Sequence, residues 1–200
     1  ILHISTAKEL SLFDGNKALS EKRITAEACI HHLWFTDADY SNKGTYIKWN
    51  PAVKTEKDRT AIRAALLDDR IDVVATDHAP HTVEEKSGKY FSAPSGGPLV
   101  QHGLPAMLDL VHQGVISVER VVELMSHRVA ECFQLENRGY IREGYQADLV
   151  LVNPDAAWTV TGENILYKCG WSPFTGHEFK SHVVGTWVNG TRVWNGVNIL

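Results

Sequence analysis

Short apolar runs alternate with segments of helical spacing along the first half of the chain. Residues 1–5 and 71–75 are almost continuously apolar, as is typical of strands buried on both faces of a parallel sheet. Residues 24–35 predict a further strand with its exit loop, while residues 6–19 and 54–70 predict helices. The order strand, helix, strand, helix, strand indicates consecutive βα units of an α/β fold.

The second half changes its character near Gly139. Before this point, residues 105–113 and 117–127 predict two more helices. After it, the apolar runs are short and strand-like, and they cover residues 148–152, 182–188 and 192–194. The dipeptide Asn189-Gly190 fits a two-residue hairpin turn, because both turn positions need a positive φ. We therefore expect residues 1–138 to form βα units of a barrel and residues 139–200 to form a small β-rich domain.

This barrel would be incomplete, because a (β/α)8 barrel needs eight strands and about 250 residues. The chain opens directly on an apolar run, with no Met, basic leader or cleavage site. These features favour a piece of a longer protein, in which half of an active site lies elsewhere.

The composition and charge of the chain argue against some classes of binding partner. The chain is 44% hydrophobic and 22% charged, with a formal net charge of -4 and no basic run. Nucleic acid and anionic membranes are therefore not expected as partners. No apolar stretch reaches the ~20 residues of a membrane span. Three cysteines, none in a CxxC pair, favour a reducing, cytoplasmic setting over a disulfide framework.

The densest group of chemically active side chains directly follows the strand at 71–75. Asp77, His78 and His81 lie there, at the end of a strand where βα folds build their active sites. Carboxylate and imidazole both bind zinc. The alternative is a polar loop in which Asp77 caps a turn.

Other candidates stand on neighbouring segments that would face the same barrel mouth. His3 lies within the first strand, where a lone histidine is more often a core residue than a ligand. The pair His31-His32 could serve as ligand, substrate contact or packing. Asn50 could donate to and accept from a cyclic amide, although Asn-Pro is also a turn signal. Ser95-Gly96-Gly97 could bring backbone donors to a ligand or could simply be a flexible loop.

Several other functions lack support in the sequence. Ser126-His127 has no acid at triad spacing, so a serine nucleophile is not expected. No glycine pattern of the Rossmann or P-loop type is present.

Five segments, in this order, resemble dihydroorotases of the amidohydrolase superfamily. Residues 3–6 (HIST) are similar to the family's "HVST", and residues 25–37 (TAEACIHHLWFTD) to "TAEVTPHHLLLTD". Residues 48–54 (KWNPAVK) resemble "KMNPPLR". The most diagnostic stretch is IDVVATDHAPHTVEEK, and GYIREGYQADLVLVNP resembles the strand-rich region after the barrel. The resemblance covers nearly the whole chain.

The resemblance implies the C-terminal part of a (β/α)8 barrel followed by a small β-sandwich segment. It also implies a centre of one or two zinc ions and reversible hydrolysis of dihydroorotate to N-carbamoyl-aspartate. His3 would be a metal ligand, and Asp77 a ligand and the general base. The substrate contacts would be Asn50, His81, Ser95 and Gly96, with His81 bound to the substrate carboxylate. His31 and His32 match a segment that is not usually a ligand position, and the remaining ligands would lie before residue 1.

Two alternatives remain open. Another cyclic amidohydrolase, of the allantoinase or dihydropyrimidinase type, would lack a carboxylate for His81 to bind. A non-catalytic dihydroorotase-like subunit could scaffold a partner enzyme, although the presence of His3, Asp77 and His81 together argues against it. For the dihydroorotase itself we expect a homo-oligomer whose partner is its small-molecule substrate, dihydroorotate.

Overall fold

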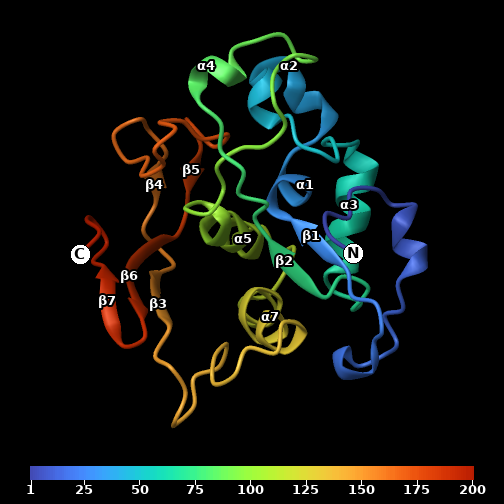
Figure 1. Ribbon diagram of the computed structural model, residues 1–200, viewed down its shortest axis with the longest axis vertical. Coiled ribbons are helices and arrows are strands. Elements are labelled where there is room, and N and C mark those ends of the chain that lie inside the picture. Colours follow the sequence, from blue (N-terminus) through green and yellow to red (C-terminus); the bar gives the residue numbers. More distant parts are fainter.

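The computed structural model describes residues 1–200 as an α/β arrangement of short elements (Figure 1). The helices are α1 (Ile30–Trp34), α2 (Tyr40–Lys43), α3 (Glu56–Ala65), α4 (Val83–Lys86), α5 (Gly103–His112), α6 (Val118–Val122) and α7 (Arg128–Cys132). The strands are β1 (Glu27–Cys29), β2 (Val73–Ala75), β3 (Leu149–Asn153), β4 (Trp158–Thr159), β5 (Glu178–Phe179), β6 (His182–Val188) and β7 (Thr191–Trp194).

The parallel pair β1–β2 lies at the centre of the molecule (Figure 1). Cys29 is paired with Ala75, so the two strands end at the same level. The predicted strand at residues 1–5 lies beside β1 but is not a regular strand. Its Ile4 N–H donates to the Glu27 carbonyl, and the Glu27 N–H donates to the Ile1 carbonyl. Because His3, between these two bonds, has a φ of 58°, the regular ladder is interrupted there.

Two further predictions for the first forty residues were wrong. The expected strand at 24–35 is extended only as far as Cys29, and α1 begins at Ile30, so His31 and His32 lie on a helix. A short apolar run does not distinguish a strand from a buried helix. The expected helix at 6–19 is reduced to a 3-10 turn over Glu9–Leu12.

The longer helices agree with the predictions. Helix α3 lies inside the predicted range 54–70, and a reciprocal capping box between Thr55 and Asp58 begins it. Helix α5 begins two residues before the predicted start at 105. At the start of α6, the Ser117 side chain accepts a hydrogen bond from the Arg120 N–H. A π-helical turn, Glu123–His127, then joins α6 to α7.

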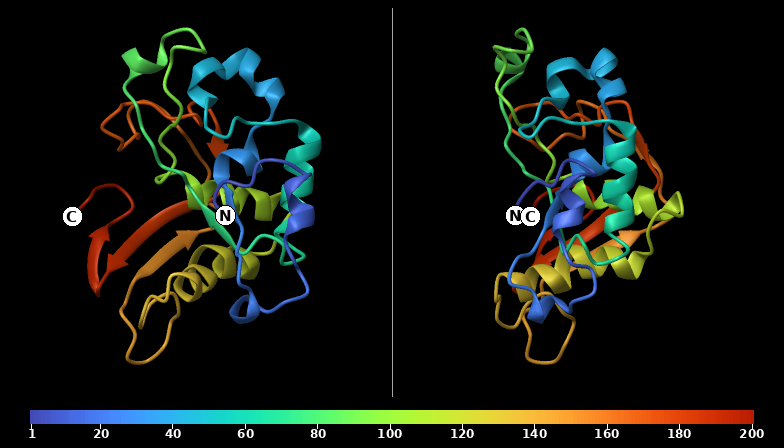
Figure 2. Two further views of the ribbon diagram at one scale, coloured as in Figure 1. Left: turned by 45° about the vertical axis from the view of Figure 1, so that its right-hand side comes forward. Right: turned by 90° about the vertical axis from the view of Figure 1, so that its right-hand side faces the viewer.

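The second half contains an antiparallel sheet in the order β3–β6–β7, which lies to one side of the parallel pair (Figures 1 and 2). The predicted hairpin turn is confirmed, because Asn189 and Gly190 have φ values of 50° and 80°. The short strands β4 and β5 form a separate antiparallel pair.

The hydrophobic core contains residues from both halves of the chain. Val160, Phe174 and Phe179 belong to the same buried cluster as Leu33 and Phe35. The segment between β3 and β6 therefore packs on the βα units, and the division at residue 139 stays a prediction. None of the helices combines the length and the apolar character that crossing a bilayer requires.

Candidate functional site

His3 is held in a defined orientation by side chains of β1. Its Nδ1 lies 3.1 Å from Glu27 Oε1 and 3.1 Å from Cys29 Sγ. A carboxylate oxygen accepts hydrogen bonds and does not donate them, so Nδ1 is the protonated nitrogen of the ring. The lone pair is then on Nε2, the nitrogen that a metal ion would use.

Asp77 faces this free nitrogen from the end of β2. Its Oδ1 lies 3.9 Å from His3 Nε2, and no group of the chain donates a hydrogen bond to its carboxylate. Asp77 and His3 both have positive φ, at 46° and 58°. Non-glycine residues rarely adopt this conformation, and those that do are enriched at functional sites. The structure thus brings together the two side chains that the sequence singled out as metal ligands.

Glu27 and Cys29 were not among the residues predicted for the site. Both point to His3 because alternate residues of a strand share one face. Burial, reinforced by the Glu27 carboxylate, raises the pKa of the Cys29 thiol, which therefore stays protonated and donates to Glu27 Oε1 over 3.4 Å. His3, Glu27 and Cys29 offer ligand atoms within 4.8 Å of one another. A carboxylate within a buried strand was the signal available in the sequence.

His81 contacts the loop that contains the other predicted substrate residues. Its Nε2 donates to the Ser95 carbonyl over 3.0 Å, and its Nδ1 lies 3.5 Å from Glu85. Gly96 has a φ of 119°, and a Cβ at this position would lie 2.4 Å from the Ala79 carbonyl oxygen. Only glycine fits this close approach between the loop and the segment before His81.

Asn50 lies on a neighbouring segment, outside the cluster formed by His3, Glu27, Cys29 and Asp77. Its residue is exposed, and no hydrogen bond joins its side chain to His3, Asp77 or His81. The Gly96 N–H donates to the Lys48 carbonyl over 2.8 Å, which keeps the Asn50 segment beside the loop.

The other histidines of the sequence motifs have contacts with residues outside the cluster. His78 Nδ1 accepts hydrogen bonds from the backbone N–H groups of Leu99 and Val100, and burial lowers the pKa of His78. The ring of His31 stacks on Trp49 with centroids 4.4 Å apart. Burial lowers the pKa of His32 to about 4. The buried environments of His31 and His32 favour neutral, packed imidazoles.

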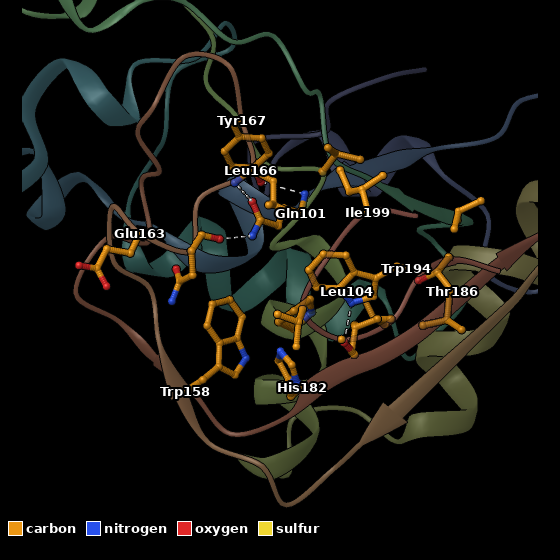
Figure 3. A pocket seen from close by; sticks show the side chains of 18 residues that line it. Gln101, Leu104, Trp158, Glu163, Leu166, Tyr167, His182, Thr186, Trp194 and Ile199 are labelled. Carbon is orange, nitrogen blue, oxygen red and sulfur yellow. Dashed lines mark hydrogen bonds between the residues drawn. The ribbon is translucent and has the colours of Figure 1, made fainter.

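A separate cavity of about 830 Å³ lies between the antiparallel sheet and residues 100–105, which include the first turn of α5 (Figure 3). Its lining is mainly apolar and includes Leu104, Trp158, Trp194 and Ile199. His3, Asp77 and His81 do not line it. The cavity is therefore distinct from the candidate metal centre.

Comparison with known proteins gives a family match over nearly the whole chain. Residues 4–193 match the amidohydrolase family. A dihydroorotase from Halobacterium salinarum is 41% identical over 196 residues, which are 98% of this chain and 45% of that protein. A dihydroorotase from Clostridium acetobutylicum is 39% identical, over 97% of this chain and 46% of that protein. The solved structure of an L-hydantoinase (dihydropyrimidinase) from Arthrobacter aurescens is also similar, with a TM-score of 0.91 and 28% sequence identity. The match covers 100% of this chain and 45% of the hydantoinase chain.

The chain belongs to the amidohydrolase family. The predicted resemblance to dihydroorotases is confirmed, and so is the α/β class. The chain spans less than half the length of the curated relatives it matches. Its assignment to the C-terminal portion of the family's chain stays a prediction.

Proposed function

We propose that this chain is part of a dihydroorotase, which hydrolyses the ring amide of dihydroorotate reversibly to give N-carbamoyl-aspartate. The observation that carries the proposal is the approach of His3 Nε2 to Asp77 Oδ1, with His81 four residues further along the loop. The identity of 41% to a dihydroorotase supports the same substrate.

The donor atoms of the cluster fit a zinc ion. Zinc binds imidazole nitrogen and carboxylate oxygen at about 2.0–2.2 Å, so two such ligands at a tetrahedral angle lie about 3.4 Å apart. The separation of 3.9 Å between His3 Nε2 and Asp77 Oδ1 exceeds this by about 0.5 Å, which a small rotation of either side chain would close. Catalytic zinc normally takes three protein ligands, so further ligands would come from the rest of the protein. When bound, such an ion supplies Lewis acidity toward the scissile carbonyl.

The chain's own residues would bind the substrate and move its protons. The Asp77 carboxylate, which accepts no hydrogen bond from the chain, is free to take a proton from the attacking water and to pass it to the leaving nitrogen. His81 would keep its Nε2–H on the Ser95 carbonyl and, when the ring is protonated, donate its Nδ1–H to the substrate carboxylate in a charge-assisted hydrogen bond. Asn50 and the backbone at Ser95 and Gly96 would contact the ring.

The finer architecture belongs to the same proposal. The parallel pair β1–β2 would be two strands of a (β/α)8 barrel, with residues 1–138 contributing to it. Residues 139–200 would form part of a small β-sandwich, which the antiparallel sheet β3–β6–β7 supports. Three free cysteines support a cytoplasmic setting. Homo-oligomerisation is a further part of the proposal, and light scattering of the full-length protein tests it.

The second candidate is a dihydropyrimidinase-type activity, favoured by the TM-score of 0.91 to a protein with that name. The two activities differ in the substrate carboxylate, which dihydroorotate has and dihydrouracil lacks. Full-length protein with zinc should therefore turn over dihydroorotate in preference to dihydrouracil. The variant His81→Ala should damage turnover of dihydroorotate far more than that of dihydrouracil.

Two results would count against the proposal. An equal loss of turnover on both substrates in His81→Ala would mean that His81 does not bind the substrate carboxylate. The absence of turnover by full-length, metal-loaded protein would favour a scaffold subunit. We also expect the 200-residue chain alone to be inactive, and robust turnover by it would require His31, His32 or His78 to be reconsidered as ligands.

A further inference from the structure

Lys86 is a fully buried lysine at the end of α4, with 0% of its surface exposed. No carboxylate forms an ion pair with it. Its Nζ instead donates to three backbone carbonyls: Gly96 at 2.8 Å, Pro94 at 3.0 Å and Lys48 at 3.4 Å. A buried charge without an opposite charge is costly, so these bonds must hold the ammonium in place.

The three acceptors belong to the two segments that contain the predicted substrate contacts. Pro94 and Gly96 flank Ser95, and Lys48 lies two residues before Asn50. The Lys48 side chain strengthens the same connection, because its Nζ donates to the carbonyls of Tyr90 and Ala93. Two ammonium groups thus bind four carbonyls of the loop from Tyr90 to Gly96.

The loop is also held from a second side. The carbonyls of Pro94 and Gly96 face Lys86, whereas the Ser95 carbonyl between them accepts the hydrogen bond from His81. Because one ammonium binds the carbonyls on both sides of Ser95, it fixes where the intervening Ser95 carbonyl is presented to His81. His81 and Lys86 are themselves connected by α4, which a capping box between Thr82 and Glu85 begins.

We propose that Lys86 is a positioning residue for the substrate loop, which holds the Pro94–Gly97 backbone against His81 without touching the substrate. This role rests on the proposed function, because it assigns the loop to substrate binding. Without the ammonium, the carbonyls of Pro94 and Gly96 lose their partner and the loop is released from the Lys48 segment. Substrate binding then weakens more than the chemical step.

The test compares full-length wild-type protein with the variants Lys86→Met and Lys89→Met. Lys89 is an exposed lysine directly before the loop, and its side chain makes no hydrogen bond. We expect Lys86→Met to raise KM for dihydroorotate by about 10- to 100-fold, the factor that the loss of charge-assisted hydrogen bonds implies. The kcat should change much less, and Lys86→Arg should restore part of the loss. Lys89→Met should behave as wild type.

Hydrogen exchange provides a readout that does not depend on activity. Peptides covering residues 92–98 should exchange faster in Lys86→Met than in wild type and Lys89→Met. If Lys86→Met does not fold, Gly96→Ala tests the same loop with the lysine intact, because its Cβ would displace the backbone beside Ala79. It should raise both KM and exchange.

Wild-type exchange in Lys86→Met would overturn the proposal, as would a fall in kcat at unchanged KM. If wild-type protein does not hydrolyse dihydroorotate, the proposed function fails, while the exchange experiment still decides whether Lys86 holds the loop.

Discussion

Replacing Glu27 by glutamine should weaken metal binding without unfolding the protein. Glu27 Oε1 lies 3.1 Å from His3 Nδ1, and the carboxylate is only 10% exposed, so little water competes for this contact. Glutamine keeps the size of the side chain but removes the charge that favours the Nδ1–H form of His3. Removing such a partner of a metal-bound histidine typically costs about 10- to 100-fold in metal affinity, or about 1.4–2.7 kcal/mol.

The assay is a competition titration of metal-free, full-length protein against a chromogenic zinc chelator. Glu21→Gln is the matched control, because Glu21 is exposed and its carboxylate has no partner in the chain. Thermal unfolding of both metal-free variants shows whether the fold is intact. If Glu27→Gln binds zinc as tightly as wild type, the carboxylate of Glu27 does not orient His3 for metal binding.

Three further predictions concern stability. Asp72→Asn should lower the free energy of unfolding by about 3–5 kcal/mol in urea titrations, because it leaves the Lys22 ammonium buried without the carboxylate that lies 2.6 Å from its Nζ. Asp68→Asn is the control: it breaks an exposed ion pair with Arg70 and should lower the free energy of unfolding by less than about 1 kcal/mol. Burial lowers the pKa of His102 to about 4 from its ordinary value of 6.5, so the unfolded chain takes up this proton first as the pH falls. Stability should therefore be full above pH 6.5 and fall by about 3 kcal/mol by pH 4, and His102→Asn should show a smaller fall, whereas an unchanged pH dependence would contradict this. Chelation of the metal should lower the melting temperature of full-length protein by mass action, and an unchanged melting temperature would mean that no ion is bound.

Local sequence patterns determined the regular elements whose signals lie within a few residues of one another. Helix α3 follows from its apolar spacing, and the hairpin between β6 and β7 follows from Asn189-Gly190. The position of Asp77 after a buried apolar run placed it at a strand end, and the resemblance paired it with His3. Each of these conclusions depends on neighbouring residues or on a motif, so no long-range contact had to be known.

Only the tertiary structure decided which side chains meet across the chain. Cys29 and Glu27 contact His3 although more than twenty residues separate them in sequence, and Lys86 binds carbonyls on both sides of it. Helix α1 begins where a continued strand was expected, because burial satisfies the same apolar residues in either conformation. The periodicity of apolar residues indicates which face of a helix or strand is buried, but not which residues pack against that face. The partners of a buried charge are therefore fixed by packing between segments that the sequence leaves far apart.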